Sequence, residues 1–262
     1  MNKNKSSKGQ VNEEANFWDS YFRGQYIGRN RFERWIASLH PAVPNPRECT
    51  DRLLMALGQI DDKHICDIGC GTGLLTWELA NRGARVSAID ISMEAVKMAR
   101  ERNKEFSGRV DVQQMDVSKL LYNDGSFDLV TGIWILHHLD TVKAAKEVSR
   151  VLKPGGKAVF IKPLAHNPIS NIWRRLTPSF RTPDERPLSY SQISEMGRHF
   201  SSVNYQEYAL LTLLSSFVYL MTYNHKFKKR SAELLARLET PFLKVCKPLR
   251  RYSGQVLIEF TK

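Results

Sequence analysis

Residues 64–73 read His-Ile-Cys-Asp-Ile-Gly-Cys-Gly-Thr-Gly, and the fold of the chain is decided here. Mostly apolar residues lead to Asp67 and then to three glycines at alternate positions, Gly69, Gly71 and Gly73, before a helix-compatible run. Glycine is needed where a backbone turns sharply and where a ligand must approach it, because no Cβ is in the way. The unpaired N–H groups of the following helix point at whatever lies over such a turn. The stretch therefore predicts a buried strand, a tight ligand-binding turn and a helix.

The spacing of the glycines separates the nucleotide-binding families that use such turns. A dinucleotide fingerprint has the form G-x-G-x-x-G, but here the third glycine comes one residue early, at Gly73, and Leu74 holds the expected place. A P-loop needs a lysine after its last glycine, and no lysine follows Gly73. The pattern D-x-G-x-G-x-G at a strand end resembles motif I of the class I S-adenosylmethionine (SAM) methyltransferases.

The second and third predicted strands also end in acids, Asp90 and Asp116. A carboxylate at the end of the second strand can accept hydrogen bonds from both hydroxyls of a ribose. In the resembled family, the acid after the third strand or its neighbour contacts the adenine amino group, and Val117 would pack on the ring. Acids at three strand ends are hard to explain as core packing, so we expect Asp67, Asp90 and Asp116 to belong to one site.

Strand-like and helix-like segments alternate along the chain. Seven segments have strand character: residues 64–68, 85–90, 110–116, 127–133, 157–161, 203–209 and 255–260. Such alternation predicts a doubly wound parallel sheet whose strand carboxyl ends, and therefore the ligand, lie at one edge. The run Leu-Lys-Pro-Gly-Gly at 152–156, expected as a turn before the fifth strand, is another landmark of the resembled family. The resemblance implies an α/β fold with a Rossmann-like seven-stranded sheet of order 3-2-1-4-5-7-6, the last strand antiparallel.

The resemblance covers residues 61–161 well and residues 162–262 loosely, within one domain. We expect a disordered tail at 1–12, a helical cap at 13–60, the SAM-binding core at 61–161, and a substrate-side part at 162–262 with insertions after the fifth and sixth strands. The aromatic residues that crowd the cap resemble the N-terminal helices that lie over SAM in this family, where Tyr21 or Tyr26 would contact the cofactor. The alternative is that these aromatic residues only pack the cap on the sheet.

The resemblance implies SAM as the methyl donor and S-adenosylhomocysteine (SAH) as the product. The implied SAM-binding residues are Asp67, Gly69, Cys70, Gly71, Thr72, Gly73, Asp90, Ile91, Met115, Asp116, Val117, Ile133 and Tyr21. Next to the fourth strand, His137 and His138 are candidates for a general base, because imidazole takes up a proton near neutral pH. His166, in the insertion, is a third candidate. The alternative is that these histidines cap or pack a helix.

Composition sets the class and the expected compartment. The chain has 262 residues, no run that reaches the ~18 apolar residues of a membrane span, and a polar N-terminus without a signal-like apolar region. Its four cysteines, Cys49, Cys66, Cys70 and Cys246, show no metal-ligand or disulfide spacing. We therefore expect a reduced, cytoplasmic protein without a metal site.

The net charge of +12 is uneven along the chain. Residues 61–160 hold fourteen Lys or Arg and fourteen Asp or Glu, whereas residues 224–251 hold nine Lys or Arg against two Glu. The uncharged segment 210–223, expected as one helix, leads directly into this basic cluster. An apolar helix followed by cations can lie on an anionic membrane, so residues 208–230 predict peripheral contact with the inner membrane face. The alternative is a core helix with a solvated basic face.

Three functions fit these observations. The first is a methyltransferase that acts on a small-molecule, glycan or lipid-like acceptor, most often by O-methylation. The second is a tRNA or rRNA methyltransferase, which the basic cluster favours, although no recognisable RNA-binding module accompanies it. The third is a SAM-binding regulatory protein without catalysis, which the presence of all three strand-end acids disfavours.

Overall fold

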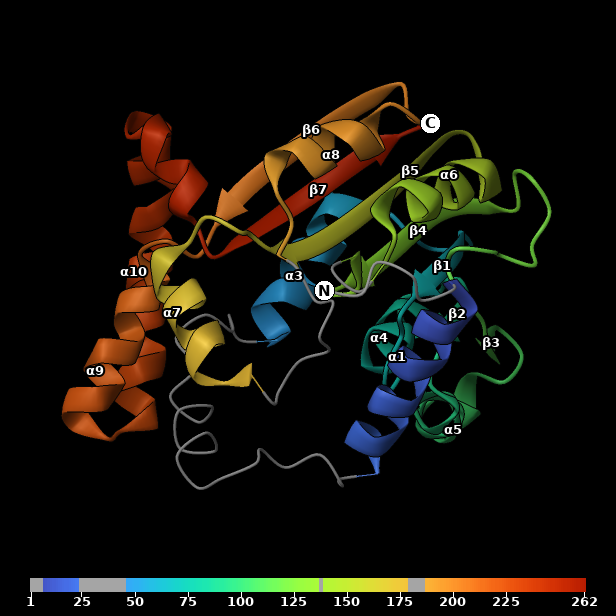
Figure 1. Ribbon diagram of the computed structural model, residues 1–262, viewed down its shortest axis with the longest axis horizontal. Helices are drawn as coiled ribbons and strands as arrows, with labels where there is room; N and C mark the ends of the chain where they lie inside the picture. The colour runs from blue at the N-terminus through green and yellow to red at the C-terminus, as the bar shows by residue number, and fades with distance from the viewer. Residues whose placement is uncertain (1–6, 24–45, 137–138, 179–186) are drawn as a thin grey trace.

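A central twisted sheet with helices on both faces forms the protein (Figure 1). The computed structural model describes residues 7–23, 46–136, 139–178 and 187–262. The strands are β1 (His64–Ile68), β2 (Arg85–Asp90), β3 (Val110–Gln114), β4 (Phe127–Ile133), β5 (Leu152–Pro163), β6 (Ser202–Tyr208) and β7 (Gln255–Thr261). Their order in the sheet is β3-β2-β1-β4-β5-β7-β6, which confirms the predicted order and the α/β Rossmann-like class.

The strand directions bring the predicted site residues to one edge. β1 runs parallel to both β2 and β4, β2 is parallel to β3, and β4 is parallel to β5. β7 is antiparallel to its two neighbours, β5 and β6, as predicted. The chain order reverses between β1 and β4, which is the point where ligands bind in open parallel sheets, outside the carboxyl ends of the strands.

Two apolar clusters bury the two faces of the sheet. On one face, α3 (Pro46–Leu57), α4 (Leu74–Asn81) and α5 (Met93–Arg102) contribute to a cluster that includes Leu53, Leu79, Val96 and the strand residue Ile161. On the other face, α6 (Thr141–Val151) and α8 (Tyr190–Gly197) pack with Phe160 and other strand residues. The sheet is therefore buried on both sides, as expected for a doubly wound fold.

Polar residues cap the helices that follow the strands. The Ser92 hydroxyl accepts a hydrogen bond from the N–H of Ala95 at the start of α5, and Asp140 accepts one from the N–H of Lys143 at the start of α6. α7 (Pro168–Leu176) begins with a proline after Asn167, whose side chain accepts from the N–H of Ser170. Each cap satisfies an N–H group that has no partner inside its helix.

The N-terminal region differs from the prediction. α1 (Ser7–Phe22) begins inside the segment that we expected to be disordered, so residues 7–12 are helical. The helix includes these residues because an apolar side chain among them packs at the sheet edge: Val11 lies in the wall of a cavity there. α3 begins at Pro46, with proline in the first helical turn, where its missing N–H costs nothing.

The segment 210–223 is not one helix, in contrast to the prediction. Ala209 adopts a left-handed backbone (φ 62°), η4 (Thr212–Leu214) follows, and α9 (Ser215–Thr222) is short. Tyr223 is again left-handed (φ 48°), which ends α9. α10 (His225–Val245) follows directly after it.

Two strands also differ in length from the prediction. β3 ends at Gln114, so Asp116 lies in the following loop. β5 includes the Leu-Lys-Pro-Gly-Gly run, with Gly155 at a φ of 73° and a register shift against β4. Among the described residues, none of the helices is long and apolar enough to span a bilayer.

Candidate active site

A cavity of about 360 Å³ opens at the carboxyl ends of the strands around the β1–β4 switch point. Its lining comes from the turn after β1, the ends of β2 and β4, the loop after β3, the start of α6, and α1. The lining residues are Val11, Glu14, Trp18, Phe22, Gly69, Gly71, Asp90, Ile91, Met115, Asp116, Val117, Ser118, Ile133, Trp134, Ile135, Leu139, Asp140 and Lys143. This is the edge at which the sequence predicts the ligand.

The glycines of the turn have different reasons to lack a side chain. All three have positive φ, between 52° and 75°. A Cβ on Gly69 would lie 2.5 Å from the Ile135 side chain, and a Cβ on Gly73 would lie 2.9 Å from the Cα of Ala99. A Cβ on Gly71 would meet only the Cζ of Phe22, at 3.7 Å. Gly69 and Gly73 are therefore needed for packing, whereas Gly71 leaves its backbone open to the cavity.

Asp90 is held against the glycine turn by backbone N–H groups. One carboxylate oxygen accepts from the N–H of Gly71 and the other from the N–H of Ser92, each at 2.9 Å. Burial raises the pKa of Asp90, and these N–H donors oppose the rise because they stabilise the charged form. Asp90 therefore lies beside Gly71 in the cavity wall, as predicted.

Asp67 occupies a different place. It is buried beneath the turn, and its carboxylate accepts a hydrogen bond of 2.6 Å from the Thr76 hydroxyl of α4. Burial raises the pKa of Asp67 to about 7, the Thr76 bond opposes the rise, and the charge of Asp90 adds to it. Asp67 does not line the cavity. Its hydrogen bond with Thr76 connects the glycine turn to α4.

The loop between β3 and β4 carries four lining residues in succession, Met115 to Ser118. The Asp116 carboxylate accepts hydrogen bonds from the N–H and the hydroxyl of Ser118, at 2.8 and 2.7 Å. The sulfur of Met115 accepts from the N–H of Leu121 at 3.4 Å. These contacts hold the loop compact next to the cavity.

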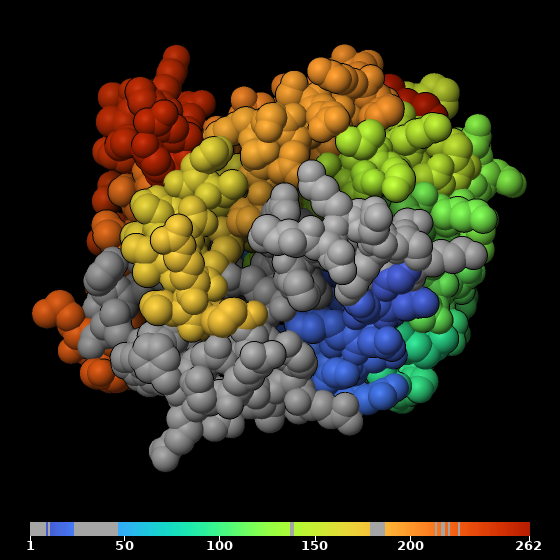
Figure 2. Space-filling model, in the orientation of Figure 1, coloured from blue at the N-terminus to red at the C-terminus, as the bar shows by residue number. Residues whose placement is uncertain are grey.

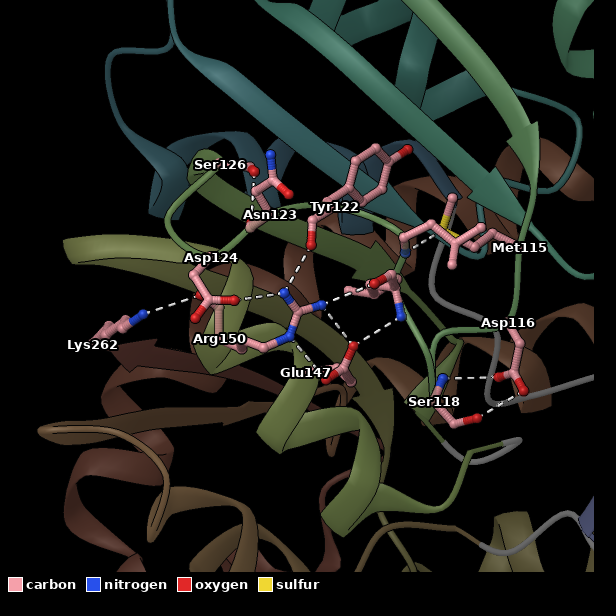
Figure 3. Close-up of polar contacts among 12 residues, drawn as sticks. Met115, Asp116, Ser118, Tyr122, Asn123, Asp124, Ser126, Glu147, Arg150 and Lys262 are labelled. Atoms are coloured by element: carbon pink, nitrogen blue, oxygen red, sulfur yellow. Dashed lines mark hydrogen bonds and ion pairs between the residues drawn. The ribbon is translucent and has the colours of Figure 1, made fainter.

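Two residues of α6, Arg150 and Glu147, clamp the other end of this loop (Figure 3). The Arg150 guanidinium donates to the carbonyls of Leu120 and Tyr122 at 2.9 and 2.7 Å and to the Asp124 carboxylate at 2.8 Å. Its remaining donors bind Glu147, whose carboxylate also accepts from the N–H of Leu120 at 2.9 Å. We call this pair the loop clamp, because it joins α6 to the loop that bears Asp116.

α1 closes one side of the cavity and is tied to α5. The Asp19 carboxylate accepts from the Ser92 hydroxyl and from the N–H of Glu94, at 2.5 and 3.1 Å. Arg23 pairs with the Glu94 carboxylate at 3.0 Å. The side chains of Trp18 and Phe22 reach the cavity from the same helix. Figure 2 shows α1 (blue) at the molecular surface.

Trp134 stands in the cavity wall with a strained backbone. Its φ is 57°, a left-handed conformation that a bulky residue rarely adopts. The N–H of Trp134 donates to the carbonyl of Ile161 and its indole N–H donates to the Gln255 side chain, at 2.9 and 3.2 Å. Strained residues of this kind persist where the surroundings hold them, and they cluster at functional sites.

Most of the predicted cofactor residues come together. Those that line the cavity are Gly69, Gly71, Asp90, Ile91, Met115, Asp116, Val117 and Ile133, whereas Asp67, Cys70, Thr72, Gly73 and Tyr21 do not line it. Tyr21 is exposed and contacts the rings of Trp18 and Phe22. His137, His138 and Tyr26 lie outside the described residues. His166 is exposed, stacks on Tyr190 and does not line the cavity.

The sequence prediction missed the lining residues of α1 and of the segment after β4. Trp18 and Phe22 belong to the aromatic cap, so aromatic composition is a signal for them, but composition alone does not distinguish them from Tyr21. Glu14, Asp140 and Lys143 gave no signal, because isolated charges on predicted helices do not show which way they face.

The charges of the wall indicate the kind of ligand that fits. Four carboxylates line the cavity, those of Glu14, Asp90, Asp116 and Asp140, against one cation, Lys143. A polyphosphate would meet repulsion here, whereas a nucleoside with hydroxyls and positive charge fits. Within the described part of the chain, no group of three or more His, Cys, Asp or Glu side chains is placed to hold a metal ion.

An open glycine turn, strand-end carboxylates and this sheet order define the class I SAM-dependent methyltransferase fold. Residues 66–160 match the family model described as "Methyltransferase domain". Over these residues the chain is therefore similar to methyltransferase domains, and its sheet has the strand order of the class I fold.

The chain is similar to a protein of related sequence and to solved structures of the same fold. A ubiquinone biosynthesis O-methyltransferase of Alkalilimnicola ehrlichii is 37% identical over 125 residues, which are 47% of this chain and 50% of that protein. Among solved structures, a geranyl diphosphate C-methyltransferase of Streptomyces coelicolor, in complex with Mg²⁺, geranyl diphosphate and SAH, covers 98% of this chain and 99% of its own with a TM-score of 0.63 and 17% identity. The [4+2]-cyclase SpnF covers 96% of both chains with a TM-score of 0.63 and 18% identity.

These likenesses have a clear limit. The sequence match spans about half the length of the O-methyltransferase relative and 47% of this chain. The solved structures share the fold alone at such identities, and one of them is titled as a cyclase. The acceptor therefore has to be argued from the site.

Proposed function

We propose that the protein is a SAM-dependent methyltransferase that transfers a methyl group to an oxygen of a small-molecule or lipid-like acceptor. The observation that carries the proposal is the acidic cavity wall around the open backbone of Gly71. SAM has a sulfonium, an ammonium and two ribose hydroxyls, and all of these suit carboxylates. The relative named for ubiquinone biosynthesis O-methyltransferase supports oxygen as the acceptor atom.

The chain's residues have separable roles in this proposal. Asp90 would accept the ribose hydroxyls, and Asp116 or its neighbour the adenine amino group, with Ile91, Met115 and Val117 beside the base. SAM, when bound, supplies a methyl group that is already activated by the sulfonium. The protein then has to align the acceptor with that methyl group and exclude water, and positioning of this kind contributes roughly 7–11 kcal/mol. α1 supplies the wall that excludes water, through Trp18 and Phe22.

His137 remains the first candidate for the general base. In the chain it lies between Ile135 and Leu139, which both line the cavity. We predict that His137→Ala lowers kcat about tenfold or more, measured with labelled SAM, while the dissociation constant of SAH in calorimetry stays unchanged. An unchanged kcat would remove His137 from this role and leave His138 as the candidate. His166, which is exposed and outside the cavity wall, becomes the last choice.

The function as a whole is tested in two steps. Calorimetry with SAM and SAH comes first, and the absence of binding to both would overturn the proposal. Methyl transfer from labelled SAM is then assayed with hydroxylated aromatic compounds, their prenylated forms, a glycan and tRNA. Transfer to one of the first two classes supports the proposal. Transfer to tRNA alone would establish the RNA alternative, and binding without any transfer would favour a regulatory protein.

Contact with an anionic membrane is a proposal independent of this chemistry. The sequence predicts it for residues 208–230, but the segment 210–223 is divided between η4 and α9.

A further inference from the structure

α10 stands at the left side of the molecule in Figure 1, beyond the end of β6 and the start of β7. It is 21 residues long and packs against α9, η4 and η5 (Lys247–Tyr252). In Figure 2 the end of the α10 region (red) projects from the upper left of the molecule. One face of this helix is therefore attached to the protein while another faces outward.

The inner face of α10 is defined by Glu239 and Leu243, which are both buried. The Glu239 carboxylate accepts hydrogen bonds from the N–H groups of Ala209, Leu211 and Thr212, at 2.6, 2.7 and 3.3 Å. These bonds cap η4 and the turn before it, and they set the rotation of α10 about its axis.

The outer face carries a continuous apolar stripe. Phe227, Leu234, Leu238 and Val245 are 52%, 60%, 53% and 83% exposed. On a regular helix, spacings of seven, four and seven residues place them within about 20° of one line, and Pro241 lies inside the helix between Leu238 and Val245. The line is about 27 Å long, and it lies roughly 120–160° around the helix from Glu239 and Leu243. We call these four residues the outer stripe.

A row of cations runs beside the outer stripe. Arg230, Arg237 and Lys244 are exposed and repeat every seven residues, so they follow the stripe along one flank. Lys226 and Lys229 are exposed near the start of the same helix. Glu233 is the exposed acid among the described side chains of α10, since Glu239 is buried.

We infer that α10 lies on an anionic lipid surface, with the outer stripe in the acyl boundary and the flanking cations at the head groups. An exposed apolar face beside basic residues is the pattern of helices that lie in a membrane interface, and each cation near an anionic surface adds to the attraction. Pairing with a second copy through the stripe would bring two positive rows together, which is unfavourable. The contact concerns α10, which shares only residues 225–230 with the predicted segment 208–230, and it does not rest on the proposed methyl transfer.

The test uses the full-length protein and sedimentation with vesicles, without SAM or acceptor. We expect co-sedimentation with vesicles of phosphatidylcholine mixed with phosphatidylglycerol, weakening as salt is added, and little with phosphatidylcholine alone. Leu234→Glu and Leu238→Glu should each lower the partition coefficient about tenfold. Arg237→Gln and Lys244→Gln should each lower it about fivefold. Met55→Glu, at an exposed apolar residue of α3, is the matched control and should bind like the unmodified protein.

Two further measurements make the result decisive. Urea unfolding of each variant shows that loss of binding does not come from loss of the fold, since all the substituted side chains are exposed. Analytical ultracentrifugation measures self-association. Absence of binding to the anionic vesicles, equal binding of Leu238→Glu, or a dimer that Leu238→Glu dissociates would each overturn the inference.

Discussion

Gly71 and Gly73 are two residues apart on one turn, yet their substitution should have different consequences. We predict that Gly71→Ala weakens SAH binding about tenfold or more while the free energy of unfolding falls by only about 1–2 kcal/mol, the cost of a left-handed alanine. Its Cβ meets no protein atom closer than 3.7 Å, so it enters the cavity. Calorimetry with SAH and urea unfolding give the two quantities.

Gly73→Ala is the matched comparison. Its Cβ would lie 2.5 Å from the amide of Asn103 and 2.9 Å from the Cα of Ala99, so overpacking adds to the backbone strain and the loss of stability should reach about 3 kcal/mol. If Gly71→Ala bound SAH normally, the ligand would not lie against this turn.

The raised pKa of Asp67 gives stability a specific dependence on pH. Its pKa rises from 3.8 to about 7 on folding, so between these values the folded protein holds a proton that the unfolded chain has lost. The stabilising contribution is therefore complete below about pH 4 and is lost as the pH rises through about 7. We predict that Asp67→Asn, which keeps the shape and the acceptor for Thr76, lacks this loss.

The measurement is urea unfolding of both proteins across that pH range. The free energy of unfolding of the unmodified protein, minus that of Asp67→Asn, should fall from about pH 4 to about pH 7 and then become constant. A difference that stays flat or rises with pH would show that Asp67 is ionised in the folded protein.

Single residues show where reading the sequence succeeds and where it stops. Asp90 and Asp116 follow strands, and strand ends are set by hydrophobic pattern and topology, so their meeting at the cavity was predictable. Trp18 lines the cavity, whereas Tyr21 does not. Which of the two side chains faces the cavity depends on the rotation of α1 about its axis, and the hydrogen bonds between Asp19 and α5 set this rotation. A local sequence pattern does not show contacts between segments that are far apart in the chain.

At the scale of elements, the loop clamp connects α6 to the cofactor side of the cavity. We predict that Arg150→Lys keeps the charge but loses the forked bonds to the carbonyls of Leu120 and Tyr122, lowers the free energy of unfolding by about 2 kcal/mol, and weakens SAH binding severalfold. The binding effect follows because the same loop carries Met115 and Asp116. Urea unfolding and SAH calorimetry measure the two effects.

Lys153→Gln is the control for the loop clamp. It removes the pair between Lys153 and Asp128, at 2.8 Å, just after α6. That pair is partly exposed and should contribute less than about 1 kcal/mol, with no change in SAH binding. Equal SAH binding by Arg150→Lys and the unmodified protein would limit the clamp to a structural role.

Element boundaries were predictable where caps and periodicity agree and not where distant contacts decide. β1, β2 and β4 follow from short, mostly apolar runs. The division of the segment 210–223 does not, because its first turn is held by Glu239, which lies 27 or more residues further along the chain. The orientation of α10, and with it the outer stripe, depends on the same side chain.

At the scale of the whole molecule, the resemblance to one family predicted the sheet order, including an antiparallel last strand. The hydrophobic pattern alone gives strands and a fold class, but it does not place β7 between β5 and β6. The last strand of the chain is therefore an inner strand of the sheet, with a neighbouring strand on each side. Val256, Ile258 and Phe260 of β7 are completely buried.

The whole fold should therefore depend on its final strand. We predict that a chain ending at Gly254 shows no cooperative urea transition and no SAH binding, although residues 66–160, the cavity glycines and all the lining carboxylates are intact. The three buried side chains of β7 contribute about 1.5–3 kcal/mol each, which together rivals the total stability of about 5–15 kcal/mol of a typical domain. Their loss also leaves β6 without its only recorded partner among the described strands and opens the edge of β5. A chain that starts at Ser7 is the control and should unfold cooperatively and bind SAH. If the chain ending at Gly254 also did both, the part of the sheet that matches the methyltransferase family model, β1 to β5, would be a folding unit without β7, and the rest of the sheet would be an addition to it rather than part of one core.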